Sequence, residues 1–199
     1  MSQLDKILAM HYNILYVKIQ GWEMKRNSIN EMLRISLFSA LIAVSAMIAI
    51  PLPIPVTLQT FAIFTALFTL GGFGALCAIL IYTAIGIVGL PVFAGFGAGI
   101  GYLLGASGGF VLAFPIAALA FMLLETLFGK SDKKHVVYAS VSLLLIYLIG
   151  SIWFVLVYAG ADGFLAAFAV SALPYIPIDA VKLALAYVVS KRLKKLVDF

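Results

Sequence analysis

The chain alternates long apolar runs with short segments that hold most of its charged residues, and this alternation limits what it can fold into. A helix needs about 20 mostly apolar residues to cross the roughly 30 Å hydrocarbon core of a bilayer. Only 11% of the 199 residues are charged and 64% are hydrophobic, whereas soluble domains average about 25% charged residues. The sequence therefore predicts an all-α integral membrane protein.

Six transmembrane helices are expected in a single membrane domain that covers residues 24–199. Proline, glycine and charged residues separate the apolar runs, because they interrupt or end helices. The predicted spans are residues 32–50, 58–70, 75–88, 110–128, 136–158 and 176–195. A short outer helix is expected at 164–173. Residues 1–23 are expected to form an N-terminal extension or an interfacial segment.

Basic residues gather on one side of this six-span arrangement. Lys25, Arg26 and Arg34 flank the first span, residues 130–134 separate the fourth and fifth spans, and residues 191–195 close the last one. The segments after the first, third and fifth spans contain no Lys or Arg. Since Lys and Arg are enriched in cytoplasmic loops, both termini are expected to be cytoplasmic.

The start of the last apolar run, residues 174–182, places an acid and a base three residues apart. Residues at i and i+3 share one face of a helix, so Asp179 and Lys182 point in the same direction. Pro177 suits the first turn of a helix better than its interior, and the helix dipole favours a carboxylate in that turn. Ionisable residues inside a membrane segment are costly and are usually functional. The pair is either a ligand site or an internal ion pair that only secures the helix start.

A glycine-rich connection at residues 89–110 is predicted to cover the outer mouth of a pocket. Its glycines disfavour a continuous helix, and irregular backbone at membrane depth is tolerated only where it is buried in protein or lines a cavity. The residues expected around this pocket are Gly89, Phe93, Phe96, Tyr102, Gly105 and Gly108. Gln59 is expected either to bind a ligand or to be satisfied by neighbouring backbone.

These groups predict the chemistry of the ligand. A carboxylate accepts N–H groups, an ammonium donates to a carbonyl, and small-molecule pockets are mostly apolar with few polar groups. We therefore expect a small, largely apolar ligand with an amide-like or urea-like edge.

Other functional classes find little support in the sequence. There is no His/Glu zinc pattern, no G-x-S-x-G and no pair of aspartates in facing spans, so neither catalytic residues nor a metal site are expected and the chain is not predicted to be an enzyme. Gly129-Lys130-Ser131 resembles the end of a phosphate-binding loop, but Leu124 stands where that motif needs glycine. The net charge of +5 comes without a nucleic-acid recognition motif.

One face of the first span carries the small residues Ser36, Ser39, Ala40 and Ala43. Small residues at this spacing let another helix approach closely. The face serves either packing within the protein or docking of a separate membrane subunit.

Four segments in order resemble the BioY family, the biotin-binding S components of energy-coupling factor (ECF) vitamin transporters. They are PLPIPVTLQT (51–60), GGFGALCAILIYTAIGIVGLPVFAGFGAG (71–99), GASGGFVLAF (105–114) and PYIPIDAVK (174–182). The similarity covers about residues 30–195. The chain departs from the usual family pattern at residues 105–110, where the family reads GPTGGY, and at Ile178, where it has glycine.

The resemblance implies a six-helix S-component fold in a prokaryotic cytoplasmic membrane. It implies that biotin is captured from outside by Asp179 and Lys182, with Gln59 and the pocket residues Gly89, Phe93, Tyr102, Gly105 and Gly108 around them. It also implies assembly with a transmembrane coupling subunit and two cytoplasmic ATPases through the small-residue face. ATP is then used by the partners, and this chain needs no cofactor. An S component for another small vitamin and an autonomous secondary permease are the alternatives.

Overall fold

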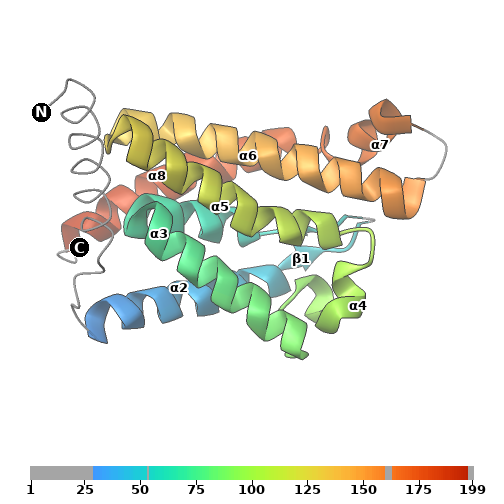
Figure 1. Cartoon of the computed structure of the whole chain (residues 1–199), viewed down its shortest axis with the longest axis horizontal. Coiled ribbons are helices and arrows are strands. Elements are labelled where there is room, and N and C mark those ends of the chain that lie inside the picture. Colours follow the sequence, from blue (N-terminus) through green and yellow to red (C-terminus); the bar gives the residue numbers. More distant parts are fainter. Residues whose placement is uncertain (1–28, 53, 160–162, 197–199) are drawn as a thin grey trace, which may run out of the picture. The chain divides into compact units, whose positions relative to one another are not determined.

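The structure, a computed structural model, describes residues 29–52, 54–159 and 163–196, and most of these residues are helical (Figure 1). The chain divides into two compact units, Met1–Leu33 and Arg34–Phe199, and the core and the pocket residues belong to the second. Four helices in the described ranges are long and apolar enough to cross a membrane, which indicates a multi-pass membrane protein. The predicted extension at residues 1–23 lies outside the described residues.

Helix α2 (Ile29–Met47) ends earlier than the predicted span 32–50. Ala49–Ile50 instead forms strand β1, which pairs antiparallel with β2 (Val56–Thr57), so the all-α prediction missed one small hairpin. A residue that precedes proline is forced toward extended backbone, and Pro51 follows directly. The Leu58 N–H then donates to the carbonyls of Ser45 and Ile48, which satisfies acceptors at the end of α2.

Helix α3 (Gln59–Val88) reverses direction at Gly71, whose backbone has φ 76° and ψ 177°. Residues 23 positions apart in a straight helix are separated by about 34 Å, yet the side chains of Gln59 and Tyr82 are hydrogen-bonded. The predicted helices 58–70 and 75–88 are therefore the two halves of α3. The reversal falls within residues 71–74, the glycine-rich gap between these two predicted spans, but it is tighter than that gap because only Gly71 departs from helical geometry.

The glycine-rich connection at residues 89–110 is not one continuous helix, as predicted, but parts of it are helical. It contains the 3₁₀ turn η1 (Ala94–Phe96) and the short helix α4 (Gly99–Leu103). Helix α5 (Gly108–Phe128) begins two residues earlier than predicted. Glycine is required there for packing, since a Cβ at Gly109 would overlap the side chain of Trp153.

The remaining helices lie close to their predicted positions. Helix α6 (Asp132–Phe154) starts four residues before the predicted boundary at 136, because Asp132 favours the positive end of the helix dipole, and it continues as the π-helical turn η2 (Val155–Ala159). Helices α7 (Gly163–Ser171) and α8 (Ile176–Leu196) confirm the helices predicted at 164–173 and 176–195 within two residues at each end.

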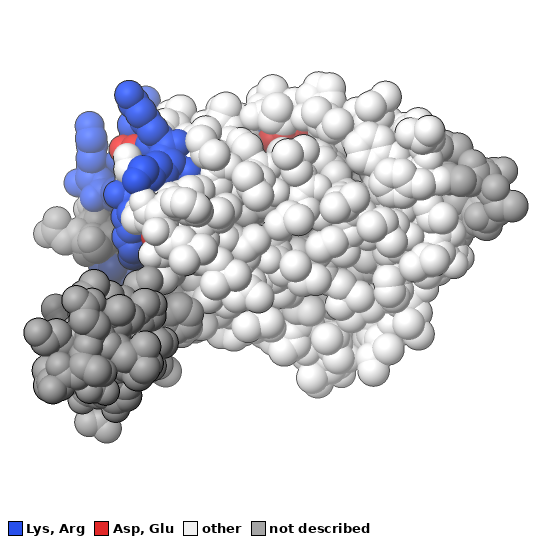
Figure 2. Space-filling view, turned by 45° about the horizontal axis from the view of Figure 1, so that its top comes forward, with Lys and Arg blue, Asp and Glu red and all other residues white. Residues whose placement is uncertain are grey.

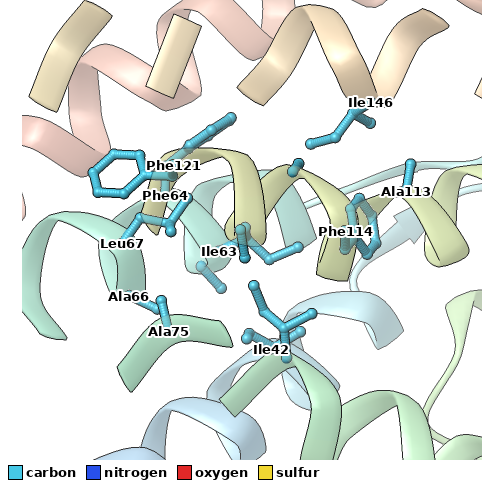
Figure 3. Close-up of a cluster of buried hydrophobic side chains, with 14 of the residues drawn as sticks. Ile42, Ile63, Phe64, Ala66, Leu67, Ala75, Ala113, Phe114, Phe121 and Ile146 are labelled. Atoms are coloured by element: carbon cyan, nitrogen blue, oxygen red, sulfur yellow. The ribbon is translucent and has the colours of Figure 1, made fainter. Parts of the chain in front are cut away.

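A core of aliphatic and aromatic side chains joins α2, α3, α5 and α6 (Figure 3). Ile42 of α2 contributes to this core with Ile63 of α3, Phe114 of α5 and Ile146 of α6, and all four are nearly inaccessible. Ala66 and Ala75, one from each half of α3, are fully buried in the same core. This core holds in place the helix segments that carry the pocket.

Candidate functional site

A cavity of about 60 Å³ lies among the β2–α3 junction, α4, the first turns of α5, the middle of α6 and the start of α8. Its apolar lining includes Val111 and Phe114 of α5 and Ile146 of α6. Its polar lining comes from several elements, and both charged residues belong to α8. The polar residues that line it are Thr57, Gln59, Thr60, Tyr102, Ser107, Tyr147, Ser171, Tyr175, Asp179 and Lys182.

Asp179 lies in the first turn of α8 and is only 6% exposed. Its Oδ1 accepts hydrogen bonds from Thr60 Oγ1 at 2.8 Å and from Lys182 Nζ at 2.7 Å. Its Oδ2 accepts one from Tyr147 Oη at 2.7 Å. A buried carboxylate needs these hydrogen bonds, because removing the charge from water is costly unless the group is paired and hydrogen-bonded.

Lys182 is 8% exposed and carries the matching charge. Its ammonium donates to the Thr57 carbonyl at 2.7 Å and to Thr60 Oγ1 at 3.3 Å, in addition to Asp179. An ammonium has three donors, and all three are used. The prediction that Asp179 and Lys182 share one helix face is confirmed, and the ammonium also tethers strand β2 to α8.

Gln59 belongs to a second polar group beside this pair. Its amide Nε2 donates to the Tyr82 hydroxyl, and its Oε1 accepts from Thr57 Oγ1 at 3.0 Å. Its partners are thus side chains, whereas the sequence suggested either a ligand or neighbouring backbone.

The aromatic residues of the glycine-rich connection occupy different positions. Tyr102 lines the pocket, and Phe93 stacks on it from behind at a centroid distance of 5.0 Å. Burial raises the pKa of the Tyr102 phenol, which keeps it a neutral donor. Phe96 is 64% exposed, so its prediction as a pocket wall was wrong. Phe96 and its neighbour Gly95 both have a positive φ.

The three predicted glycines do not line the pocket. Gly89 ends α3 with φ 114° and is exposed. The Gly105 carbonyl accepts a hydrogen bond from Trp153 Nε1 at 3.0 Å. Gly108 packs against the backbone of Leu103 so closely that a Cβ would overlap it. These glycines shape the backbone around the pocket rather than contacting its interior.

The sequence reasoning missed Thr60, Tyr147 and Tyr175. Tyr147 places a hydroxyl group within an apolar run, and this is the one feature of the sequence that could have marked it as a pocket residue. Its partner Asp179 lies 32 positions later, and nothing in a single sequence connects the two. The Tyr175 hydroxyl donates to the Ile54 carbonyl at 2.6 Å. Among the described residues, no three His, Cys, Asp or Glu side chains gather to hold a metal ion.

The fold buries one part of the small-residue face of α2 and leaves the other part exposed. Ser39 is 4% exposed and Ala43 is half-buried, so both pack inside this chain, whereas Ser36 and Ala40 are exposed. Leu37, Leu41 and Val44 extend the exposed side. A surface for another protein would thus be centred on Ala40 and its exposed neighbours.

The sequence is similar to known proteins over most of its length. Residues 19–199 match the BioY family. A "Probable biotin transporter BioY" of Pyrococcus horikoshii is 40% identical over 161 residues, which is 80% of this chain and 93% of the relative. The "Biotin transporter BioY" of Thermotoga maritima is 35% identical over 83% of this chain and 96% of its own length.

A solved structure has the same fold. It is described as the S-component for biotin from an ECF-type ABC transporter, and it superimposes with a TM-score of 0.75 at 24% identity. The similarity covers 84% of this chain and 92% of that one. The family match spans nearly the whole sequence, including the segment that carries Asp179 and Lys182. The chain therefore belongs to the BioY family.

Proposed function

We propose that this chain captures biotin in the pocket and serves as the substrate-binding membrane subunit of an ATP-driven ECF transporter. The observation that carries the proposal is the buried Asp179–Lys182 pair, joined at 2.7 Å and lining the cavity, in a chain of the BioY family. An acid and a base side by side match a ureido group, which presents N–H donors next to a carbonyl acceptor. No covalent step and no cofactor in this chain is needed.

In the proposed complex the ureido N–H groups of biotin donate to Asp179, and Lys182 donates to the ureido oxygen. Lys182 already uses all three of its donors and Asp179 already accepts three hydrogen bonds, so biotin has to replace some of these bonds. Phe114, Val111 and Ile146 offer apolar surface to the fused rings. The tail then points toward Tyr102 and Ser107, which also line the cavity.

Binding requires the pocket to widen. One water needs about 10–15 Å³ of such space, so 60 Å³ holds only a few waters and is too small for a bicyclic vitamin. The wall residues Val56 and Tyr102 are half-buried and lie outside the long helices. Their displacement is the proposed route by which biotin enters from the outer side.

We infer six membrane crossings with both termini in the cytoplasm of a prokaryotic cell. The two halves of α3 provide two crossings beside α2, α5, α6 and α8. The first half, from Gln59 to Leu70, is only about 18 Å long, which is less than the roughly 30 Å thickness of the hydrocarbon core. The segment before Gln59, which forms part of the pocket wall, therefore completes this crossing. Lys130, Lys133 and Lys134 then lie with the basic end of α8 on the cytoplasmic side.

The proposed partners are a transmembrane coupling subunit and two cytoplasmic ATPases that use the ATP. We place the coupling subunit against the exposed flank of α2 around Ser36 and Ala40, with Ser39 and Ala43 supporting that flank from within. Small exposed residues allow a partner helix to approach closely.

Ala40→Trp is expected to abolish co-purification with the coupling subunit and to leave biotin affinity within about twofold, because the bulky ring blocks close helix approach far from the pocket. Pull-down of the tagged chain co-expressed with its partners measures the first effect, and calorimetry the second. Leu148→Trp, at an exposed position of α6, is the matched control. Equal recovery of the coupling subunit with both variants would contradict this placement.

The function itself is tested by equilibrium binding of the purified protein to a panel of vitamins that includes biotin and thiamine. We expect saturable binding of biotin alone. Preferential binding of another vitamin would support an S component of different specificity. Biotin uptake that persists in cells without the ATPases would instead support an autonomous permease.

A further inference from the structure

The end of the second unit opposite the start of α8 carries a cluster of cations, which we call the basic collar. Figure 2 shows Lys and Arg side chains gathered at one end of the visible face, while the rest of that face is almost free of charge. The collar combines the α5–α6 connection, the first turn of α6 and the last turns of α8. Its residues are Lys130, Lys133, Lys134, Lys191, Arg192, Lys194 and Lys195.

Three collar residues contribute to the fold. Lys134 Nζ donates to the Phe128 carbonyl at the end of α5, at 2.6 Å. Lys130 Nζ lies 3.9 Å from Glu125. Lys191 Nζ lies 3.4 Å from Asp132 and 4.6 Å above the ring of Tyr187. The Lys191–Asp132 contact places the end of α8 beside the start of α6, so cations from both helices share one surface.

The other four collar residues, Lys133, Arg192, Lys194 and Lys195, are exposed and have no ion pair within the described ranges. Among the described residues of α5, α6 and α8, exposed acids are scarce beside them: Asp132 is already paired with Lys191, and Glu125 is buried. The surface therefore presents unneutralised positive charge to whatever lies against it.

We propose that the basic collar binds the anionic headgroups of phospholipids. Two candidate membrane spans end or begin at the collar, α5 at Phe128 and α6 at Asp132, which places its cations at the level of the headgroups. Large apolar side chains adjoin them and are strongly exposed: Phe128 is 60% exposed, Val137 59% and Leu196 81%. Acyl chains cover such residues, whereas an acidic soluble partner would give no reason for their exposure.

This surface is independent of the pocket. About 22 Å of helix separates Asp179 from Lys194 along α8, so neutralising the collar changes no pocket contact. Cations at a membrane surface each strengthen attachment to anionic lipid by about fivefold, and salt weakens the effect over a Debye length of about 10 Å at 0.1 M.

The test measures which lipids the purified full-length protein retains from micelles that contain equal amounts of phosphatidylglycerol and phosphatidylcholine, counted by native mass spectrometry. We expect the unmodified protein to retain phosphatidylglycerol over phosphatidylcholine by at least about tenfold at low salt, with the preference falling as salt rises. The combined Lys133→Gln, Arg192→Gln, Lys194→Gln and Lys195→Gln variant should lose it. The matched variant with Lys133→Arg, Lys194→Arg and Lys195→Arg should retain it, because the charge is conserved.

Thermal unfolding of both variants checks that each is folded. The proposal is overturned if the glutamine variant retains phosphatidylglycerol as the unmodified protein does, or if the unmodified protein has no preference. It is also overturned if the glutamine variant keeps its lipids but loses co-purifying ATPase subunits, because the collar would then serve a protein partner.

Discussion

Asp179→Asn is expected to reduce biotin affinity by at least about 100-fold and to lower the free energy of unfolding by about 3–5 kcal/mol, the usual cost of breaking a buried ion pair. The substitution leaves Lys182 as an unpaired ammonium that is only 8% exposed. It also places an amide where Thr60, Tyr147 and Lys182 all donate, and an amide has one acceptor oxygen. Calorimetry with biotin and thermal unfolding in detergent measure the two effects.

Lys182→Met should also remove biotin binding, and the double variant separates binding from stability. With both charges gone, the double variant is expected to be more stable than either single variant while still failing to bind.

The exposed Asp132–Lys191 pair is a matched control. Asp132→Asn and Lys191→Met should each change stability by less than about 1 kcal/mol and leave biotin affinity unchanged. Wild-type affinity in Asp179→Asn would show that the ligand binds elsewhere.

Glu125→Ala is expected to destabilise the protein by about 2–4 kcal/mol, since it leaves buried polar groups without partners. Glu125 Oε2 accepts a hydrogen bond from the Gly72 N–H at 2.9 Å, directly after the reversal of α3 at Gly71. Its Oε1 lies 3.1 Å from His135 Nε2 on α6. One carboxylate thus joins the turn of α3 to α5 and α6.

In a chain of this size the loss corresponds to a melting temperature lower by about 5–15 °C. Glu125→Gln should lie between the wild type and the alanine variant, because the amide oxygen still accepts from Gly72 but carries no charge. Thr126→Ala, at the exposed neighbouring position, is the control and should melt with the wild type. If Glu125→Ala also melted with the wild type, the carboxylate would not secure the α3 turn.

Helix positions were predictable from the sequence wherever a local rule decides them. Pro177 and Asp179 fixed the start of α8 because both favour the first turn of a helix. The break between the spans 58–70 and 75–88 was predictable because glycine, which occupies three of the four intervening positions, reaches positive φ without a steric penalty. The hydrogen bond beside that reversal was not predictable, since the Gly72 N–H donates to Glu125, which lies 53 positions later.

The candidate site was only partly predictable for the same reason. The Asp179–Lys182 pair lies within one helical turn, so its geometry follows from the spacing alone. Thr60 and Tyr147 reach Asp179 only through tertiary packing. Phe93 and Phe96 could not be distinguished from their sequence, although one is fully buried and the other points outward.

The pocket is closed by contacts between the first third and the last fifth of the chain. Thr60 and Asp179 are 119 positions apart, Ile54 and Tyr175 are 121 apart, and Thr57 and Lys182 are 125 apart. During synthesis the earlier helices leave the ribosome long before α8, and contacts of such long range form late. A nascent chain that stops before Ile176 has α2, α3, α5 and α6 but leaves the Thr60 and Tyr147 hydroxyls without their carboxylate. With Asp179 as the proposed ligand site, binding of biotin would report that the last helix has been inserted and docked.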